Sequence, residues 1–405
     1  MIHVCYCLHD ETGHYSKFTG TSMLSLFDNT REEVTVHIFH DNTLSETNMF
    51  KLKAVADKYD QQIKFYNIDK ICPEKIQYLR EKIPAYVASR FTIGAFYRLM
   101  IEKKFFTDDV NKIIYLDSDT IINIDIAKLW EFSMKRYVIA AVPEVYAAQN
   151  YMITNKFLIN TGKISASDYF CSGIIVLNLD KVDPKFFYEA IQWLADNPQC
   201  ECPDQDILNN FFSTTYRKLP PEFNSFVQIE LRTAGGVITE KIYHYAGSVA
   251  LGFDMKNPFD KLFFKYFIKT QWFDLDFIEN AYKIMKKIYI ECKDFLIETT
   301  SIMSGKERAF FVDSNNFDAI KNIFSVQDDE ESIIAKNVSS IDELISSMRK
   351  SQGKKIYFIV AKYPAIKEKL INAGFIEKQD FIDATAFLSD KHGYNLPIYP
   401  LLKYL

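Results

Sequence analysis

Short apolar segments alternate with helical patterns through residues 1–270 of this chain, and this alternation most restricts its fold. Strands that alternate with helices of about ten to fifteen residues are typical of βαβ units and a mainly parallel sheet. The expected helices include 18–28, 45–59 and 92–104. The expected strands are 2–8, 34–39, 63–67, 113–116, 137–142 and 173–179. We therefore expect an α/β fold with a mixed, mainly parallel sheet flanked by helices.

Two carboxylates, Asp117 and Asp119, directly follow the buried-looking strand at 113–116. In an open α/β sheet, ligands collect beyond the carboxyl ends of the strands. Residues i and i+2 of an extended segment share a face, so both carboxylates can converge on one hard divalent ion. A turn or helix cap after the strand is the alternative for so short an acidic motif.

The composition narrows the classes of partner and compartment. The net charge of -5 argues against general attraction to nucleic acid, so we expect no nucleic-acid partner. No stretch reaches the roughly 20 apolar residues of a membrane span, and the N-terminal residues lack a basic leader. Seven cysteines, an odd number, indicate reduced thiols rather than a disulfide framework. We expect a cytoplasmic protein with no transmembrane segment, and peripheral membrane contact stays open.

The pattern changes after residue 270. Residues 274–300 predict a long amphipathic helix, and strands at 309–313 and 355–360 predict a second small α/β unit. That unit is Rossmann-like but has no Gly-rich phosphate loop, so we assign it no cofactor. The expected domains are 1–270, a connecting helix at 271–300, and a C-terminal unit of unknown role at 301–405.

Three further motifs follow the Asp117-Ser118-Asp119 motif in order. They are the small polar turn before a strand in Asp168–Leu179, the helix start Pro203-Asp204-Gln205-Asp206, and Tyr243-His244-Tyr245-Ala246-Gly247. Together the four motifs resemble glycosyltransferase family 8 over roughly residues 1–265. The resemblance implies a GT-A fold, a nucleotide-sugar donor that is usually UDP-linked, manganese dependence, and transfer with retention of anomeric configuration.

The resemblance also implies a metal centre. Asp117, Asp119 and His244 would ligate Mn2+ or Mg2+, and two carboxylates with one imidazole suit manganese. The ion would act as a Lewis acid toward the departing UDP. Without the other motifs, His244 alone would be interpreted as a core histidine.

The resemblance places Gln205 and Asp204 near the reactive face of the donor sugar. Gln205 would stabilise positive character at the anomeric carbon, and Asp204 would bind sugar hydroxyls. Asp206 is a candidate helix cap. No nucleophilic carboxylate for a double displacement is identified, and the mechanism of retention stays open.

The donor-binding set follows from the same resemblance. His9 or Asp10 would read the uracil base, and the guanidinium of Arg98 suits sugar hydroxyls or phosphate. The complete expected set is His9, Asp10, Arg90, Arg98, Ser118, Glu144, Gly247 and Lys256.

One departure from the family pattern concerns the diphosphate. The family commonly continues its His-Tyr-x-Gly motif with a lysine, whereas this chain has Ser248, and Lys256 is the nearest substitute. We expect an enzyme that moves a hexose, glucose or galactose, from a UDP-sugar to a saccharide, glycolipid or glycoprotein acceptor. The alternatives are a non-catalytic nucleotide-sugar- or partner-binding module and a nucleotidyltransferase, and no Gly-rich loop supports the latter.

Overall fold

A computed structural model of the 405-residue chain forms two compact units, Met1–Ala250 with Lys256–Phe273, and Leu251–Met255 with Asp274–Leu405. Most of the expected helix at 274–300 lies outside the described residues. The structure describes residues 1–89, 93–147, 156–233, 235–246, 258–279, 282–283, 286, 305–313, 329–335, 340–361 and 363–384.

The first unit is built on a seven-stranded sheet in the order β3-β2-β1-β4-β7-β6-β8. Neighbours from β3 to β4 are parallel, β7 is antiparallel to both β4 and β6, and β8 is parallel to β6. The strands are β1 (Ile2–Leu8), β2 (Val34–His40), β3 (Gln62–Asn67), β4 (Lys112–Leu116), β6 (Ile139–Pro143), β7 (Phe170–Asn178) and β8 (Arg217–Lys218). The expected α/β fold with a mixed, mainly parallel sheet is confirmed.

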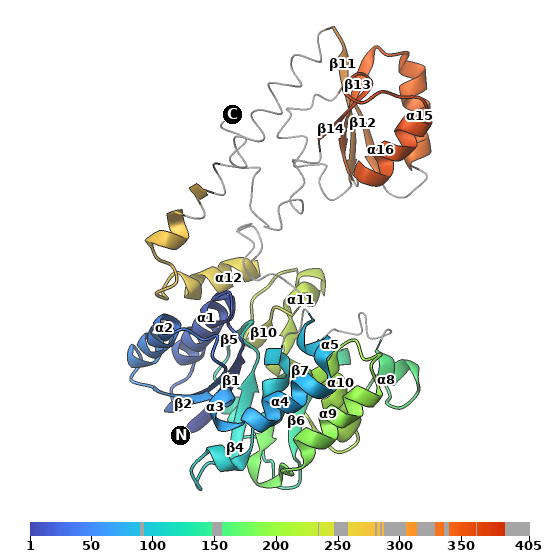
Figure 1. Ribbon diagram of the computed structural model, residues 1–405. Coiled ribbons are helices and arrows are strands. Elements are labelled where there is room, and N and C mark those ends of the chain that lie inside the picture. Colours follow the sequence, from blue (N-terminus) through green and yellow to red (C-terminus); the bar gives the residue numbers. More distant parts are fainter. Residues whose placement is uncertain are drawn as a thin grey trace. The chain divides into compact units, whose positions relative to one another are not determined.

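Helices cover both faces of this sheet (Figure 1). On one face Tyr6 of β1 bonds to Ser22 of α1 through their hydroxyls (2.9 Å). On the other, the buried core joins β1, β4 and β7 to α4, α9 and α10. The larger helices are α1 (His14–Asn29), α2 (Glu46–Asp57), α4 (Pro73–Lys82), α9 (Phe186–Asp196), α10 (Pro203–Phe212) and α12 (Pro258–Phe267). The short ones are α3 (Ile68–Ile71), α5 (Pro84–Val87), α6 (Ala127–Trp130), α7 (Glu144–Ala147), α8 (Phe157–Asn160), α11 (Val227–Thr233), η3 (Leu179–Lys181) and η4 (Pro221–Phe223).

Two local predictions were wrong. The segment expected as helix 92–104 contains two 3₁₀ helices, η1 (Ile93–Met100) and η2 (Lys103–Phe105). Phe96 and Tyr97 are both buried there, so tertiary packing outweighs the weak helix propensity of aromatic residues. The expected turn before residue 173 is partly strand, because Asn209 of α10 bonds to both the N–H and the carbonyl of Phe170 and holds it in β7 (2.7 Å each).

A small second sheet lies beside the first in the order β5-β10-β9. It contains β5 (Thr120–Asn123), β10 (Lys241–His244) and β9 (Ser225–Phe226). β10 is antiparallel to β5, and His244 pairs with Thr120. The pairing brings the end of β10 to the loop that follows β4.

The second unit contains a parallel four-stranded sheet in the order β12-β11-β13-β14. Its buried core includes Phe311, Leu344 and Ile359. The elements are β11 (Glu307–Asp313), β12 (Glu331–Ala335), α15 (Ser340–Ser351), β13 (Lys355–Val360), α16 (Tyr363–Asn372) and β14 (Phe381–Asp383). Across the described residues of the whole chain, no helix has the length and apolarity to cross a membrane.

Candidate active site

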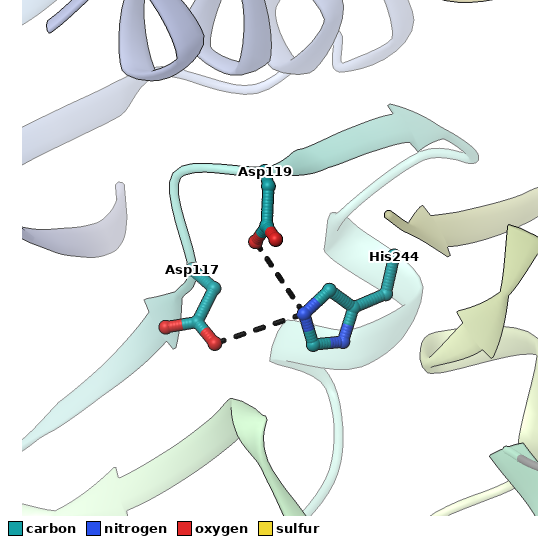
Figure 2. A group of neighbouring side chains, drawn as sticks. All are labelled: Asp117, Asp119 and His244. Carbon is teal, nitrogen blue, oxygen red and sulfur yellow. Dashed lines mark ion pairs between the residues drawn. The ribbon is translucent and has the colours of Figure 1, made fainter. Parts of the chain in front are cut away.

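The three expected metal ligands meet at the carboxyl end of β4 (Figure 2). Asp117 and Asp119 lie in the short loop between β4 and β5, and His244 ends β10. Nε2 of His244 is 3.7 Å from Oδ2 of Asp117 and 3.4 Å from Oδ1 of Asp119. One potential ligand atom from each residue lies within 4.8 Å of the others. This donor set fits a divalent ion such as Mn2+.

The orientation of His244 is fixed from its other ring nitrogen. Nδ1 lies 3.1 Å from Oδ1 of the buried Asn224, so an N–H at Nδ1 leaves Nε2 directed at the two carboxylates. Burial acts to lower the pKa of His244, but the negative charge of Asp119 raises it well above its usual range. The carboxylate pair therefore attracts positive charge to this position.

Asp117 is held by several groups of the protein. Its Oδ1 accepts hydrogen bonds from Arg98 (2.8 Å) and from the hydroxyl of Tyr115 (2.5 Å). Its backbone N–H donates to the carbonyl of Gly173 in β7 (2.7 Å). Its Oδ2 is the oxygen that faces His244.

Arg98 connects the expected metal ligands to the expected sugar-binding residues. Its guanidinium is buried, stacks on the Tyr115 ring at 4.6 Å, and lies 3.3 Å from Oδ2 of Asp204. It also donates to the carbonyl of Ser172 (3.0 Å). Burial acts to lower the pKa of Arg98, but the charge of Asp117 raises it well above its usual range. Arg98 is thus a charged bridge inside the site.

Gln205 and Glu144 form a second pair beside this bridge. The Gln205 amide donates to Oε2 of Glu144 (2.5 Å), and its carbonyl accepts the N–H of Ser172 (3.0 Å). Burial raises the pKa of Glu144, while the charge of Lys156, with Nζ 3.6 Å from Oε1, acts to lower it. Lys156 and Tyr115 were not predicted as site residues, because no motif marks them and only the fold brings them here.

The end of β1 contains the expected base readers. Nδ1 of His9 lies 2.5 Å from Oδ2 of Asp41, and this hydrogen bond raises the pKa of His9. Asp10 is only 2% exposed, and its two carboxylate oxygens accept from the N–H of Ser16 and the amide of Asn48 (3.0 Å each). Asp10 therefore anchors the start of α1, and His9 is the more accessible of the two.

Of the remaining expected donor-binding residues, one is described and three lie outside the described residues. The hydroxyl of Ser118 is hydrogen-bonded to that of Thr19 on α1 (2.8 Å). The expectation that Asp206 caps a helix starting at Ile207 was wrong, because α10 already begins at Pro203. Asp206 lies inside its first turn, where it accepts from the Cys202 N–H (3.3 Å) and the Tyr169 hydroxyl (2.7 Å). Arg90, Gly247 and Lys256 lie outside the described residues.

Comparisons with known proteins agree with this architecture. A solved structure of galactosyltransferase LgtC in complex with donor and acceptor sugar analogues has the same fold, with a TM-score of 0.53. It shares 16% identity, and the match covers 67% of this chain and 96% of that chain. The fold is the GT-A fold of glycosyltransferases. The family model described as glycosyl transferase family 8 matches residues 3–249, and the chain belongs to that family.

Curated relatives show moderate identity. General stress protein A of Bacillus subtilis (strain 168) is 24% identical over 290 residues, covering 67% of this chain and 95% of that protein. Lipopolysaccharide 1,3-galactosyltransferase of Salmonella typhimurium (strain LT2) is 26% identical over 238 residues, covering 56% of this chain and 67% of that protein. Family membership makes the chain a glycosyltransferase.

Proposed function

We propose that the first unit moves a hexose from a UDP-sugar to a saccharide acceptor, free or on a glycolipid or glycoprotein, with retention of anomeric configuration. The observation that carries this proposal is the convergence of Asp117, Asp119 and His244 at the carboxyl end of β4. Relatives named as lipopolysaccharide galactosyl- and glucosyltransferases support glucose or galactose as the donated sugar.

The three convergent side chains would hold Mn2+, or Mg2+ in its place. Such an ion supplies Lewis-acid stabilisation of the charge that develops on a departing diphosphate. Asp117 and Asp119 supply the negative charge that binds it, and Asn224 keeps Nε2 of His244 aimed at the same point.

The donor sugar would lie against Asp204, Gln205 and Glu144. Arg98 holds Asp204 close to Asp117, so the sugar-binding carboxylate and the metal ligand keep a fixed spacing. The Gln205 carbonyl is held by Ser172 and its amide by Glu144, which fixes the orientation of the amide dipole. Fixed dipoles stabilise developing charge without reorganisation. His9 would contact the base from the end of β1.

The test is release of UDP from a panel of UDP-sugars by the full chain, with and without Mn2+. We expect release from UDP-glucose or UDP-galactose that needs the metal and is lost in the Asp117→Ala/Asp119→Ala variant. Binding of UDP-sugars is measured in the same samples. Metal-dependent binding without release, with acceptors of all three kinds supplied, would favour a non-catalytic binding module instead.

A further inference from the structure

We propose that Tyr115 and Arg98 are positioning residues that restrict Asp117 to a single metal-facing oxygen, and so favour Mn2+ over Ca2+ at this site. The inference rests on the proposed function, because it concerns the metal that function requires.

Two hydrogen bonds hold one oxygen of the Asp117 carboxylate and leave the other free of them. Both hydrogen bonds, from Tyr115 at 2.5 Å and from Arg98 at 2.8 Å, end on Oδ1. The Nε2 atom of His244 faces Oδ2. Rotating the carboxylate to present both oxygens to an ion would break two charge-assisted hydrogen bonds, which are the stronger kind.

The Tyr115 hydroxyl and the Arg98 guanidinium are themselves held in place by the protein. Tyr115 is 2% exposed in β4 and lies two residues before Asp117. Arg98 comes from η1, stacks on the Tyr115 ring, and donates to the carbonyls of Ala95 (3.1 Å) and Ser172 (3.0 Å). Since so many of its N–H groups are engaged by the protein, Arg98 acts through Asp117 and Asp204 rather than as a free donor to a ligand.

A carboxylate that presents only one oxygen to the ion affects which divalent ion binds. Mg2+ demands near-ideal octahedral geometry with few protein ligands, and Mn2+ belongs with it among the ions suited to octahedral oxygen sites. Ca2+ takes six to eight oxygens and readily accepts a carboxylate through both of its oxygens. Holding Oδ1 away from the ion therefore penalises Ca2+ more than Mn2+.

The experiment compares wild type with Tyr115→Phe, which removes only the hydroxyl and leaves the ring under Arg98. Binding of Mn2+ alone is titrated by the loss of its free electron paramagnetic resonance signal, and Ca2+ is measured by competition. We expect Mn2+ affinity to fall by about 10- to 100-fold, as is usual when a partner of a metal ligand is lost. We expect the preference for Mn2+ over Ca2+ to fall as well.

Tyr243→Phe is the matched control. Tyr243 is also buried in a strand of this region, but its hydroxyl bonds the backbone of Thr239 rather than a metal ligand. Its Mn2+ and Ca2+ affinities should match wild type. Arg98→Lys, which keeps the charge but loses the two-pronged guanidinium, should shift the preference in the same direction as Tyr115→Phe.

The outcomes separate the inference from the proposed function. Wild type that binds no Mn2+ would overturn the metal role, and the inference with it. Wild type that binds Mn2+ while folded Tyr115→Phe and Arg98→Lys keep both its affinity and its ion preference would overturn the inference alone.

Discussion

Gly173 of β7 lies in direct contact with the imidazole of His244. A Cβ atom at position 173 would come 2.3 Å from Cε1 of His244 and 2.7 Å from Oδ2 of Asp117. Real Cβ atoms do not approach other atoms so closely, so the absence of a side chain at Gly173 lets the β7 backbone border two of the three proposed metal ligands. The requirement for glycine here is one of space.

Gly173→Ala should therefore damage the metal site. Either β7 or His244 must move, and displacement of about 1 Å at a reacting centre can cost about 100-fold in rate. We expect loss of Mn2+ binding and of UDP release, measured together. Ile175→Val, which removes one methyl group from the same strand, should retain both; a Gly173→Ala protein that binds Mn2+ normally would contradict the packing argument.

Asp119→Ala should abolish transfer and leave the fold intact. It removes one proposed ligand from a loop, and loss of such an electrostatic contact costs about 100- to 1000-fold. The assay is metal-dependent UDP release, with tryptophan fluorescence to confirm folding. Glu131→Gln, which changes an exposed carboxylate, is the control. A folded Asp119→Ala protein with normal release would remove this residue from the metal site.

Lys156→Met should move the acidic limb of the pH–activity profile to higher pH. Burial already raises the pKa of Glu144, and the positive charge of Lys156 opposes that rise. Without Lys156 the Glu144 carboxyl group protonates at higher pH, and the Gln205 amide then donates to a neutral carboxyl group instead of a carboxylate. Lys163→Met, at an exposed lysine, should leave the profile unchanged. If the profiles of wild type and Lys156→Met superimpose, protonation of Glu144 does not control the acidic limb.

Gly20→Ala should destabilise the first unit despite the better helix propensity of alanine. The propensity gain is at most about 1 kcal/mol. Against it, a Cβ atom at Gly20 in α1 would lie 2.2 Å from Cζ3 of Trp272, and overpacking costs about 1–3 kcal/mol. We expect a lower urea midpoint and changed Trp272 fluorescence. An unchanged or raised midpoint would show that the indole can move aside without loss.

The buried pair His37 and His3 should destabilise the first unit as the pH falls from 7 to 5, whereas His9 and His244, whose pKa values are raised, act in the opposite direction. Burial lowers the pKa of His37 to about 3, and its neighbour His3, with ring nitrogens 3.0 Å apart, also has a lowered pKa because of burial. A histidine with a lowered folded-state pKa binds its proton preferentially in the unfolded chain, so stability present above the unfolded value of about 6.5 is lost below it. For His37 this amounts to about 2 kcal/mol by pH 5.

Urea unfolding followed by tryptophan fluorescence at pH 7 and pH 5 measures this loss. His37→Phe removes this titrating group, so its free energy of unfolding at pH 5 relative to pH 7 should be higher than that of wild type. Glu32→Gln, at an exposed carboxylate of the same unit, should behave as wild type does. Equal pH dependence in wild type and His37→Phe would show that protonation of His37 does not cause this loss of stability.

Local sequence patterns predicted β1, β2, β3, β4, β6 and β7 and the position of Asp117 and Asp119 at the end of β4, but they missed the short strands β5, β8, β9 and β10. Apolar runs and an i, i+2 spacing are local properties, so they are readable without the fold. The α-helix predicted over 92–104 was wrong because the apolar side chains of this segment are buried by packing in 3₁₀ helices and do not lie along one face of an α-helix.

The sequence by itself determined an α/β unit with a carboxylate pair at a strand end, and the family resemblance suggested His244. Only the tertiary structure decided how these groups meet. His244 reaches Asp119 because β10 pairs with β5, and Asp117 is oriented because Tyr115 and Arg98 bind the same oxygen. Strand pairing and hydrogen bonding between distant segments depend on the whole core, so no local pattern encodes them.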